Sequence, residues 1–274
     1  MPKALVLQHP DIASCHLEDF PQVAPYSKSV IRIHVPDGFL LPDAAIEILK
    51  RQQIDYAVLP DIDFAELGLI VSDMDSTLIT IECVDEIAAG VGLKDKVAEI
   101  TERSMRGELD FEQSLRQRVG LLAGLDEGVL QEVFDHVLQL SPGAEYLLEE
   151  CKRHDVKFML VSGGFTFFTD RLKQQLGLDY TYANVLEIDN GKLTGRLNGR
   201  IIDAQAKKDL LVQYREQLGL QKEQVLAMGD GANDIPMLEE AGFGVAYRAK
   251  PKAQQHADLC INYGGLEAVR GWFR

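Results

Sequence analysis

The sequence predicts an α/β protein: a doubly wound parallel sheet with a helical cap insertion, plus a small α+β domain at the N-terminal end. Three observations predict this class. Short apolar runs alternate with helical patterns from residue 69 onward, as in repeated βαβ crossovers. Residues 83–140, which follow the first run, show helical periods and no strand signal. Residues 1–66 combine strand patterns with one helical pattern.

Composition narrows the classes of partner. The 274 residues carry a formal net charge of -15, and 46% of them are hydrophobic. Nucleic acids and anionic membranes attract clustered Lys and Arg, so this acidic balance predicts no nucleic-acid partner and no membrane partner. No apolar run approaches the length of a membrane span, and the first residues lack a signal-peptide pattern, so the expected location is cytoplasmic.

The N-terminal region predicts a small domain of its own. Strand patterns occur at residues 4–8, 29–35 and 56–59, and a helical pattern at 42–53. The acidic stretch 60–67 is the expected connector. We therefore expect a small α+β domain of unknown role at 1–66 and a second domain at 67–274, with the cap at about 83–140.

The first apolar run of the second domain, residues 69–73, leads into two aspartates one residue apart. A strand that is apolar on both faces is normally buried in a parallel sheet, so Asp73 and Asp75 appear where the chain leaves the core. Open α/β sheets bind ligands at this carboxyl edge. The helical insertion that follows would stand over the same edge as a lid, or form a separate structural subdomain.

Further strand and helix patterns complete the predicted sheet. Strand patterns lie at residues 156–162, 224–230, 243–247 and 258–262, and helical patterns at 165–177 and 204–219. Residues 188–202 contain two Asn-Gly pairs between short β segments, which predict a hairpin. An antiparallel edge is favoured for it over a mobile flap.

A second acidic cluster makes the first one informative. Asp230 ends the strand at 224–230, and Asp234 follows at the start of a helix. Both acidic pairs would meet at one edge of the sheet, where carboxylates repel unless a cation lies among them. An all-oxygen site of this kind suits Mg²⁺. The alternative is that Asp230 and Asp234 cap a helix and form a turn.

Anion-binding groups follow another strand. Ser162 offers a hydroxyl, and the amides after Gly163 and Gly164 could face an anion. A glycine turn with Ser162 as a helix N-cap is the alternative. Lys207, near the start of the helix at 204–219, could supply a cation. The alternative is that Lys207 is only a solvated charge on the helix surface.

These motifs resemble those of the haloacid dehalogenase-like phosphatases, and within them the phosphoserine phosphatase family. The resemblance is carried by DMDST at 73–77, VSGG at 161–164, AK at 206–207 and GDGAND at 229–234, and covers about residues 69–265. It implies Mg²⁺-dependent hydrolysis of L-phosphoserine to L-serine and phosphate, the last step of serine biosynthesis, through an aspartyl-phosphate.

The resemblance also implies residue roles. Asp73 would be the nucleophile and Asp75 the general acid and base. Mg²⁺ would be held by Asp73, Asp230 and the backbone carbonyl of Asp75, with Asp234 in or near its shell. The remaining implied substrate-binding residues are Glu82, Met105, Phe111, Arg118, Ser162, Gly163, Lys207 and Asn233. Thr77 would brace the loop.

The helical insertion bears on the substrate. Phe111, Leu115, Arg118 and Leu122 fall on one helical stripe, so Arg118 lies on an apolar face and needs an anion. The resemblance assigns it the carboxylate of phosphoserine and assigns the ammonium group to Glu82. An ion pair within the protein is the alternative for Arg118, and a helix-start acid is the alternative for Glu82.

Three other functions remain open from the sequence. One is a phosphotransferase from phosphoserine to another alcohol, or a phosphatase for another small phosphomonoester. A second is a phospho-accepting signalling protein, which would need neither Asp75 nor the large insertion. A third makes residues 1–66 a ligand sensor that controls a partner. The sequence leaves the oligomeric state open, with a homodimer among the options.

Overall fold

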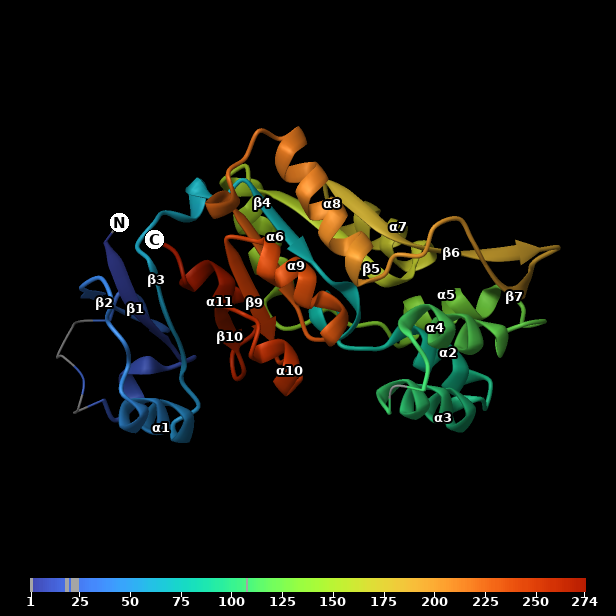
Figure 1. The fold of residues 1–274 in the computed structure, drawn as a ribbon, viewed down its shortest axis with the longest axis horizontal. Helices are drawn as coiled ribbons and strands as arrows, with labels where there is room; N and C mark the ends of the chain where they lie inside the picture. The colour runs from blue at the N-terminus through green and yellow to red at the C-terminus, as the bar shows by residue number, and fades with distance from the viewer. Residues whose placement is uncertain (1, 18–19, 21–24, 107) are drawn as a thin grey trace.

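The centre of the molecule is a seven-stranded sheet in the order β10-β9-β8-β4-β5-β6-β7 (Figure 1). The computed structural model describes residues 2–17, 20, 25–106 and 108–274. The strands of this sheet are β4 (Leu69–Ser72), β5 (Lys157–Phe165), β6 (Tyr180–Asp189), β7 (Lys192–Asn198), β8 (Val225–Gly229), β9 (Phe243–Tyr247) and β10 (Leu259–Ile261). Neighbouring strands are parallel, except that β6 and β7 are antiparallel. The predicted doubly wound α/β fold is confirmed.

Helices cover both faces of this sheet because its central strands are apolar at successive positions. In β4, Ile70 belongs to one hydrophobic core, whereas Leu69 and Val71 belong to another on the opposite face. Side chains of α6, α7 and α11 join the core of Ile70, and those of α8 and α9 join the other. The helices are α6 (Ala144–Arg153), α7 (Thr166–Leu176), α8 (Ala204–Gln217), α9 (Ile235–Glu240), α10 (Pro251–Gln254) and α11 (Glu267–Gly271).

Four helices form the insertion between β4 and β5. They are α2 (Cys83–Gly90), α3 (Lys94–Met105), α4 (Phe111–Gly120) and α5 (Gly128–His136). Figure 1 shows them grouped beyond the carboxyl end of β4. The two linkers to the core run side by side, because the Thr80 amide donates to the Gln139 carbonyl (2.9 Å) and the Ser141 amide to the Leu78 carbonyl (2.9 Å). The helical insertion thus stands at the edge where the sequence predicted a lid.

The β6–β7 hairpin forms the edge of the sheet and also contacts the cap. β7 is the last strand in the order, so the predicted antiparallel edge is present. Beyond this, the Gly124 amide donates to the Leu193 carbonyl (2.8 Å), and the Leu193 amide donates to the Leu125 carbonyl (2.9 Å). The backbone of the hairpin is therefore bonded to the cap loop between α4 and α5.

The N-terminal region is a three-stranded antiparallel sheet with one helix. Its elements are β1 (Lys3–Gln8), β2 (Val30–Val35), α1 (Asp43–Arg51) and β3 (Asp55–Pro60), and the strand order is β2-β1-β3. One face, with Ala4, Val6 and Leu59, joins the main core, whereas Leu5 and Leu7 pack on the other face with α1. This small sheet shares a core with the larger one, and the boundary at residue 66 stays a prediction.

Two buried polar groups fix the small sheet to the C-terminal segment. The Asp55 carboxylate accepts hydrogen bonds from the amides of Asn262 (2.7 Å) and Gly264 (2.8 Å). Arg32 pairs with Asp61 at 2.9 Å, and its Nη2 donates to the Trp272 carbonyl.

Within the residues described, no helix has the length and apolar character needed to cross a membrane. The cytoplasmic location stays a prediction.

Candidate active site

The first acidic pair lies where β4 ends. The Asp73 amide still donates to the Met228 carbonyl of β8 (3.0 Å), so its side chain projects from the carboxyl edge of the sheet. The carboxylate is buried, and its Oδ1 accepts the Met74 amide at 2.8 Å. The chain then turns sharply, with Ser76 at a φ of 55°. After this turn Asp75 is partly buried.

The second acidic pair converges on the first, as predicted. Carboxylate oxygens of Asp73, Asp230 and Asp234 lie within 4.8 Å of one another, and all three residues are buried. Burial and the nearby Asp234 raise the pKa of Asp73 well above its usual range, and the same causes raise the pKa of Asp230 to about 6. Three hard oxygen donors this close together fit a divalent cation such as Mg²⁺, whose charge would offset the repulsion between the carboxylates. The side chain of Asp75 is outside this group.

Lys207 lies between two of these carboxylates. Its fully buried Nζ is 2.7 Å from Asp73 Oδ1 and 2.7 Å from Asp234 Oδ1. The helix that carries it, α8, begins after Asp203, whose side chain accepts the Ala206 amide. Burial disfavours the charged ammonium, but attraction to Asp234 and Asp73 outweighs this and raises the pKa of Lys207. Lys207 is thus a buried cation and not the solvated surface charge that was the alternative.

Asp75 has the environment of a group that exchanges a proton near neutral pH. Burial and the negative charge of Glu82 raise its pKa to about 7, although the Cys83 amide donates to its Oδ1 at 3.3 Å. Glu82 is exposed at the start of α2, where its Oε1 accepts a hydrogen bond from Ser76 Oγ (2.7 Å). One carboxyl can therefore act as acid and then as base at this site.

The loop Ser162-Gly163-Gly164 lies at the carboxyl end of β5. Ser162 Oγ is buried and accepts the Gly164 amide at 2.8 Å. Helix α7 begins only at Thr166, after Phe165, so Ser162 is not its N-cap. An added Cβ on Gly164 would lie 3.0 Å from Asp75 Oδ2, which places this loop directly beside the proposed acid.

The cap closes over the same loop. An added Cβ on Gly163 would lie 2.9 Å from Phe111 Cζ, so the first residue of α4 covers the loop. On the same helix, Arg118 has a buried Nε with no hydrogen-bond partner among the described residues. This geometry agrees with the expectation that Arg118 needs an anion.

The structure shows fewer contacts for the other predicted residues. Asn233 is half-buried in the helical turn Ala232–Asp234 beside Gly231, and Thr77 is buried with no partner for its hydroxyl within the described part of the chain. Met105 ends α3, and its side chain lies outside the described residues. Sequence reasoning missed Asn184, a buried amide in the middle of β6 whose only signal was a polar residue between the apolar Ala183 and Val185.

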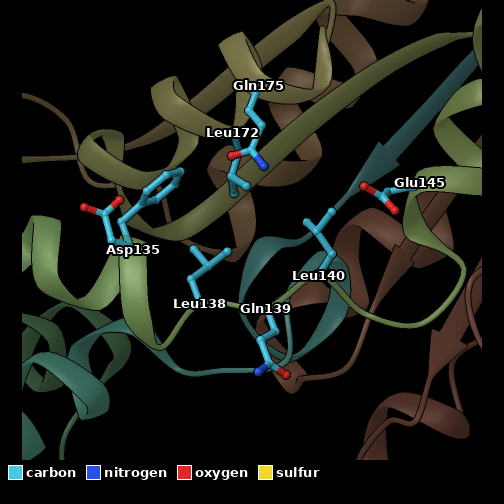
Figure 2. A pocket seen from close by; sticks show the side chains of 8 residues that line it. Asp135, Leu138, Gln139, Leu140, Glu145, Leu172 and Gln175 are labelled. Carbon is cyan, nitrogen blue, oxygen red and sulfur yellow. The ribbon is translucent and has the colours of Figure 1, made fainter.

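A separate cavity of about 470 Å³ lies beside the second cap linker (Figure 2). It is lined by Phe134, Asp135, Leu138, Gln139, Leu140, Glu145, Leu172 and Gln175. None of the predicted site residues lines it. The chemistry described above therefore belongs to the carboxyl edge of β4, β5 and β8, under the cap.

Comparisons with known proteins agree with this site. A family model of the haloacid dehalogenase-like hydrolases matches residues 67–242. A phosphoserine phosphatase from Polaromonas sp. is 52% identical over 215 residues, which cover 77% of this chain and 91% of that protein.

Two solved structures extend the comparison. A haloacid dehalogenase family hydrolase from Salmonella enterica serovar Typhi is 33% identical, with a TM-score of 0.88 over 98% of this chain and 97% of that one. A phospho-aspartyl intermediate analogue of phosphoserine phosphatase is 38% identical, with a TM-score of 0.71 over 76% of this chain and 99% of that one. The chain belongs to the haloacid dehalogenase-like hydrolases, in the branch formed by the phosphoserine phosphatases.

Proposed function

We propose that this protein is a phosphatase that hydrolyses L-phosphoserine to L-serine and inorganic phosphate, with Mg²⁺ as cofactor. The observation that carries the proposal is the convergence of Asp73, Asp230, Asp234 and Lys207 at one edge of the sheet. The names of the relatives supply the substrate, and the Nε of Arg118 in the cap, which lacks a partner within the described residues, is consistent with it.

In the proposed reaction Asp73 attacks phosphorus and the ester P–O bond breaks. Asp75 gives its proton to the serine oxygen that leaves, so the products of this step are serine and an aspartyl-phosphate. Asp75 then takes a proton from water, the water oxygen bonds to phosphorus, and the Asp73 carboxylate departs. A pKa of about 7 allows Asp75 to perform both transfers.

The charged phosphoryl group is held from several sides in this proposal. Ser162 Oγ, the Gly163 amide and Lys207 Nζ would hold its oxygens, and Asn233 would position neighbouring groups. Asp73, Asp230, Asp234 and the backbone carbonyl of Asp75 would hold Mg²⁺ when it is bound. The cation would offset the repulsion between the phosphate and the carboxylates.

The cap would select the alcohol. Arg118 matches a carboxylate through its planar guanidinium, and Glu82 would accept the substrate's ammonium group. Phe111, which covers Gly163, and Met105 would close the pocket. A substrate that bears both charges on one small carbon skeleton fits this pair.

Phosphate release from L-phosphoserine tests the proposal. We expect release with Mg²⁺, loss of release with EDTA, and loss with Asp73→Asn. Asp209→Asn, an exposed carboxylate on α8, is the matched control and should keep normal activity. Activity that survives removal of the metal or of the Asp73 carboxylate would contradict the mechanism.

A further inference from the structure

Asn184 lies where the β5–β6 ladder is interrupted. Five residues of β5, from Val161 to Phe165, lie opposite three residues of β6, from Tyr182 to Asn184. The extra residues form a bulge that carries Ser162 and its two glycines out of the regular sheet. Bulges redirect backbone groups and leave them without ladder partners, so a side chain must satisfy them when they are buried.

The Asn184 side chain supplies this partner. It is buried, and its Nδ2 donates to the Gly163 carbonyl at 2.8 Å. The amide of the same peptide unit, on Gly164, donates to Ser162 Oγ. The peptide is therefore held at both ends, and because Ser162 Oγ already accepts a hydrogen bond, its own proton is free to point at another acceptor.

The same side chain also contacts the chain segment that enters α8. Asn184 Oδ1 accepts the Ile202 amide at 2.8 Å, shortly before the helix that carries Lys207. A carbonyl can only accept and an amide can only donate, so these two partners fix the orientation of the Asn184 side chain. One amide thus connects the Ser162 loop to the start of the Lys207 helix.

We propose that Asn184 is a positioning residue for phosphoryl transfer, which holds the Ser162-Gly163 loop and the start of α8 in the geometry that receives the phosphoryl oxygens. This inference depends on the proposed function. Asn184 acts through Ser162 and Lys207, so its removal should weaken binding of the transferring group more than binding of the whole substrate.

Kinetics of Asn184→Leu and Asn184→Ser test the proposal. Leu has a similar size but no hydrogen bond, whereas Ser is too short to reach both partners. We expect kcat for L-phosphoserine to fall about 10- to 100-fold while KM changes by less than about threefold, since small displacements of reacting groups are costly. Inhibition by orthovanadate, which resembles the transferring phosphoryl group, should weaken in parallel with kcat.

A matched control separates positioning from general stability. Tyr182, on the same strand, forms a 2.6 Å hydrogen bond to Tyr214 of α8, so Tyr182→Phe also removes a bond between β6 and that helix. We expect Tyr182→Phe to lower Tm without changing kcat. Equal kcat losses in the Asn184 and Tyr182 variants, or an unchanged kcat in folded Asn184→Ser, would overturn the proposal.

A double-mutant cycle keeps the test valid if Asn184→Leu does not fold. In a Ser162→Ala background, Asn184→Ser should reduce kcat by a smaller factor than in the wild type, because its effect passes partly through Ser162. Full additivity would contradict the inference. If the wild type hydrolyses p-nitrophenyl phosphate but not L-phosphoserine, the proposed substrate is wrong, and the same variants test Asn184 on that ester.

Discussion

Lys207 balances buried negative charge among three carboxylates. Its two contacts of 2.7 Å place a positive charge between the buried carboxylates of Asp73 and Asp234. Removal of one partner from a buried ion pair leaves an uncompensated charge, which costs more than the pair itself contributes. The site therefore has two ways to offset its charge, this ammonium and a bound cation.

Lys207→Met should make the stability of the protein depend more strongly on bound Mg²⁺. Without Mg²⁺ we expect the free energy of unfolding to fall by about 3–5 kcal/mol, and with Mg²⁺ the loss should be smaller because the cation offsets the same carboxylates. Urea unfolding with and without Mg²⁺ measures this. Lys208→Met, which removes a partly exposed pair with Glu240, should change stability by less than about 1 kcal/mol. Equal stabilisation of wild type and Lys207→Met by Mg²⁺ would contradict this expectation.

The raised pKa of Asp75 predicts that kcat/KM depends on pH near neutrality. A general acid must be protonated, so kcat/KM should fall as pH rises through the pKa of Asp75, which lies at about 7 before a bound cation lowers it. Glu82→Gln removes a negative neighbour, lowers the pKa of Asp75, and should move this alkaline limb to lower pH. Profiles of kcat/KM on both sides of pH 7 measure the shift, with Glu112→Gln as an exposed control. A limb that stays in place or moves upward would show that Glu82 does not raise the pKa of Asp75.

At the scale of elements, α4 joins recognition to closure. Its first residue, Phe111, covers Gly163, and two turns later comes Arg118, whose buried Nε has no partner in the part of the chain that the structure describes. The N-cap Asp110 fixes where this helix begins, because its side chain accepts the Gln113 amide. The same helix therefore covers the Ser162-Gly163-Gly164 loop and carries the charge that would meet a substrate carboxylate.

Arg118→Met should reduce recognition without loss of stability. We expect KM for L-phosphoserine to rise about 10- to 100-fold, the value of one or two charge-assisted hydrogen bonds, and KM for phosphoethanolamine, which lacks the carboxylate, to stay nearly constant. Tm should change little, since Arg118 is only partly buried and its Nε has no hydrogen-bond partner among the described residues. A similar rise in KM for both esters would show that Arg118 does not read the carboxylate.

Elements differ in how far the sequence determined them. β4 and β8 were predictable because continuous apolar runs ending in aspartate have few other solutions, and their convergence follows from parallel pairing. Lys207 was expected as a cation, but its double pairing depends on the packing of α8 against the sheet. The bulge at Ser162 and the role of Asn184 could not be predicted, since pairing register is a property of two strands and not of either one.

At the scale of the whole molecule, the N-terminal sheet is part of the main core. Ala4, Val6 and Leu59 pack in the same cluster as Trp272 and Phe273 of the C-terminal segment. The strands and helix of this region were predictable from pattern, but the shared core was not, because burial of the second sheet face depends on which partner covers it. The small sheet thus supports the fold around β10 and the segment that follows it, and its wider role stays open.

Asp55→Ala should separate this structural role from catalysis. Loss of the carboxylate leaves the amides of Asn262 and Gly264 without their partner, so we expect the free energy of unfolding to fall by about 1–3 kcal/mol. Because β9 and β8 lie between this contact and β4, kcat should not change. Urea unfolding and phosphate release measure the two effects. The control is Glu47→Ala, which removes the exposed ion pair between Glu47 and Lys50 on α1. A parallel loss of kcat would show instead that the small sheet acts on the site.

The hairpin that reaches the cap loop also affects how the enzyme can turn over. Two chain linkers join the cap to the core. The backbone hydrogen bonds between Leu193 and the segment Gly124–Leu125 form a third, non-covalent connection. If product release requires the cap to open, the cap must either move together with the hairpin or break these hydrogen bonds. These peptide groups at the rim of the sheet would then contribute to the frequency of release, together with side-chain contacts such as that between Arg171 Nε of α7 and Gln131 of α5.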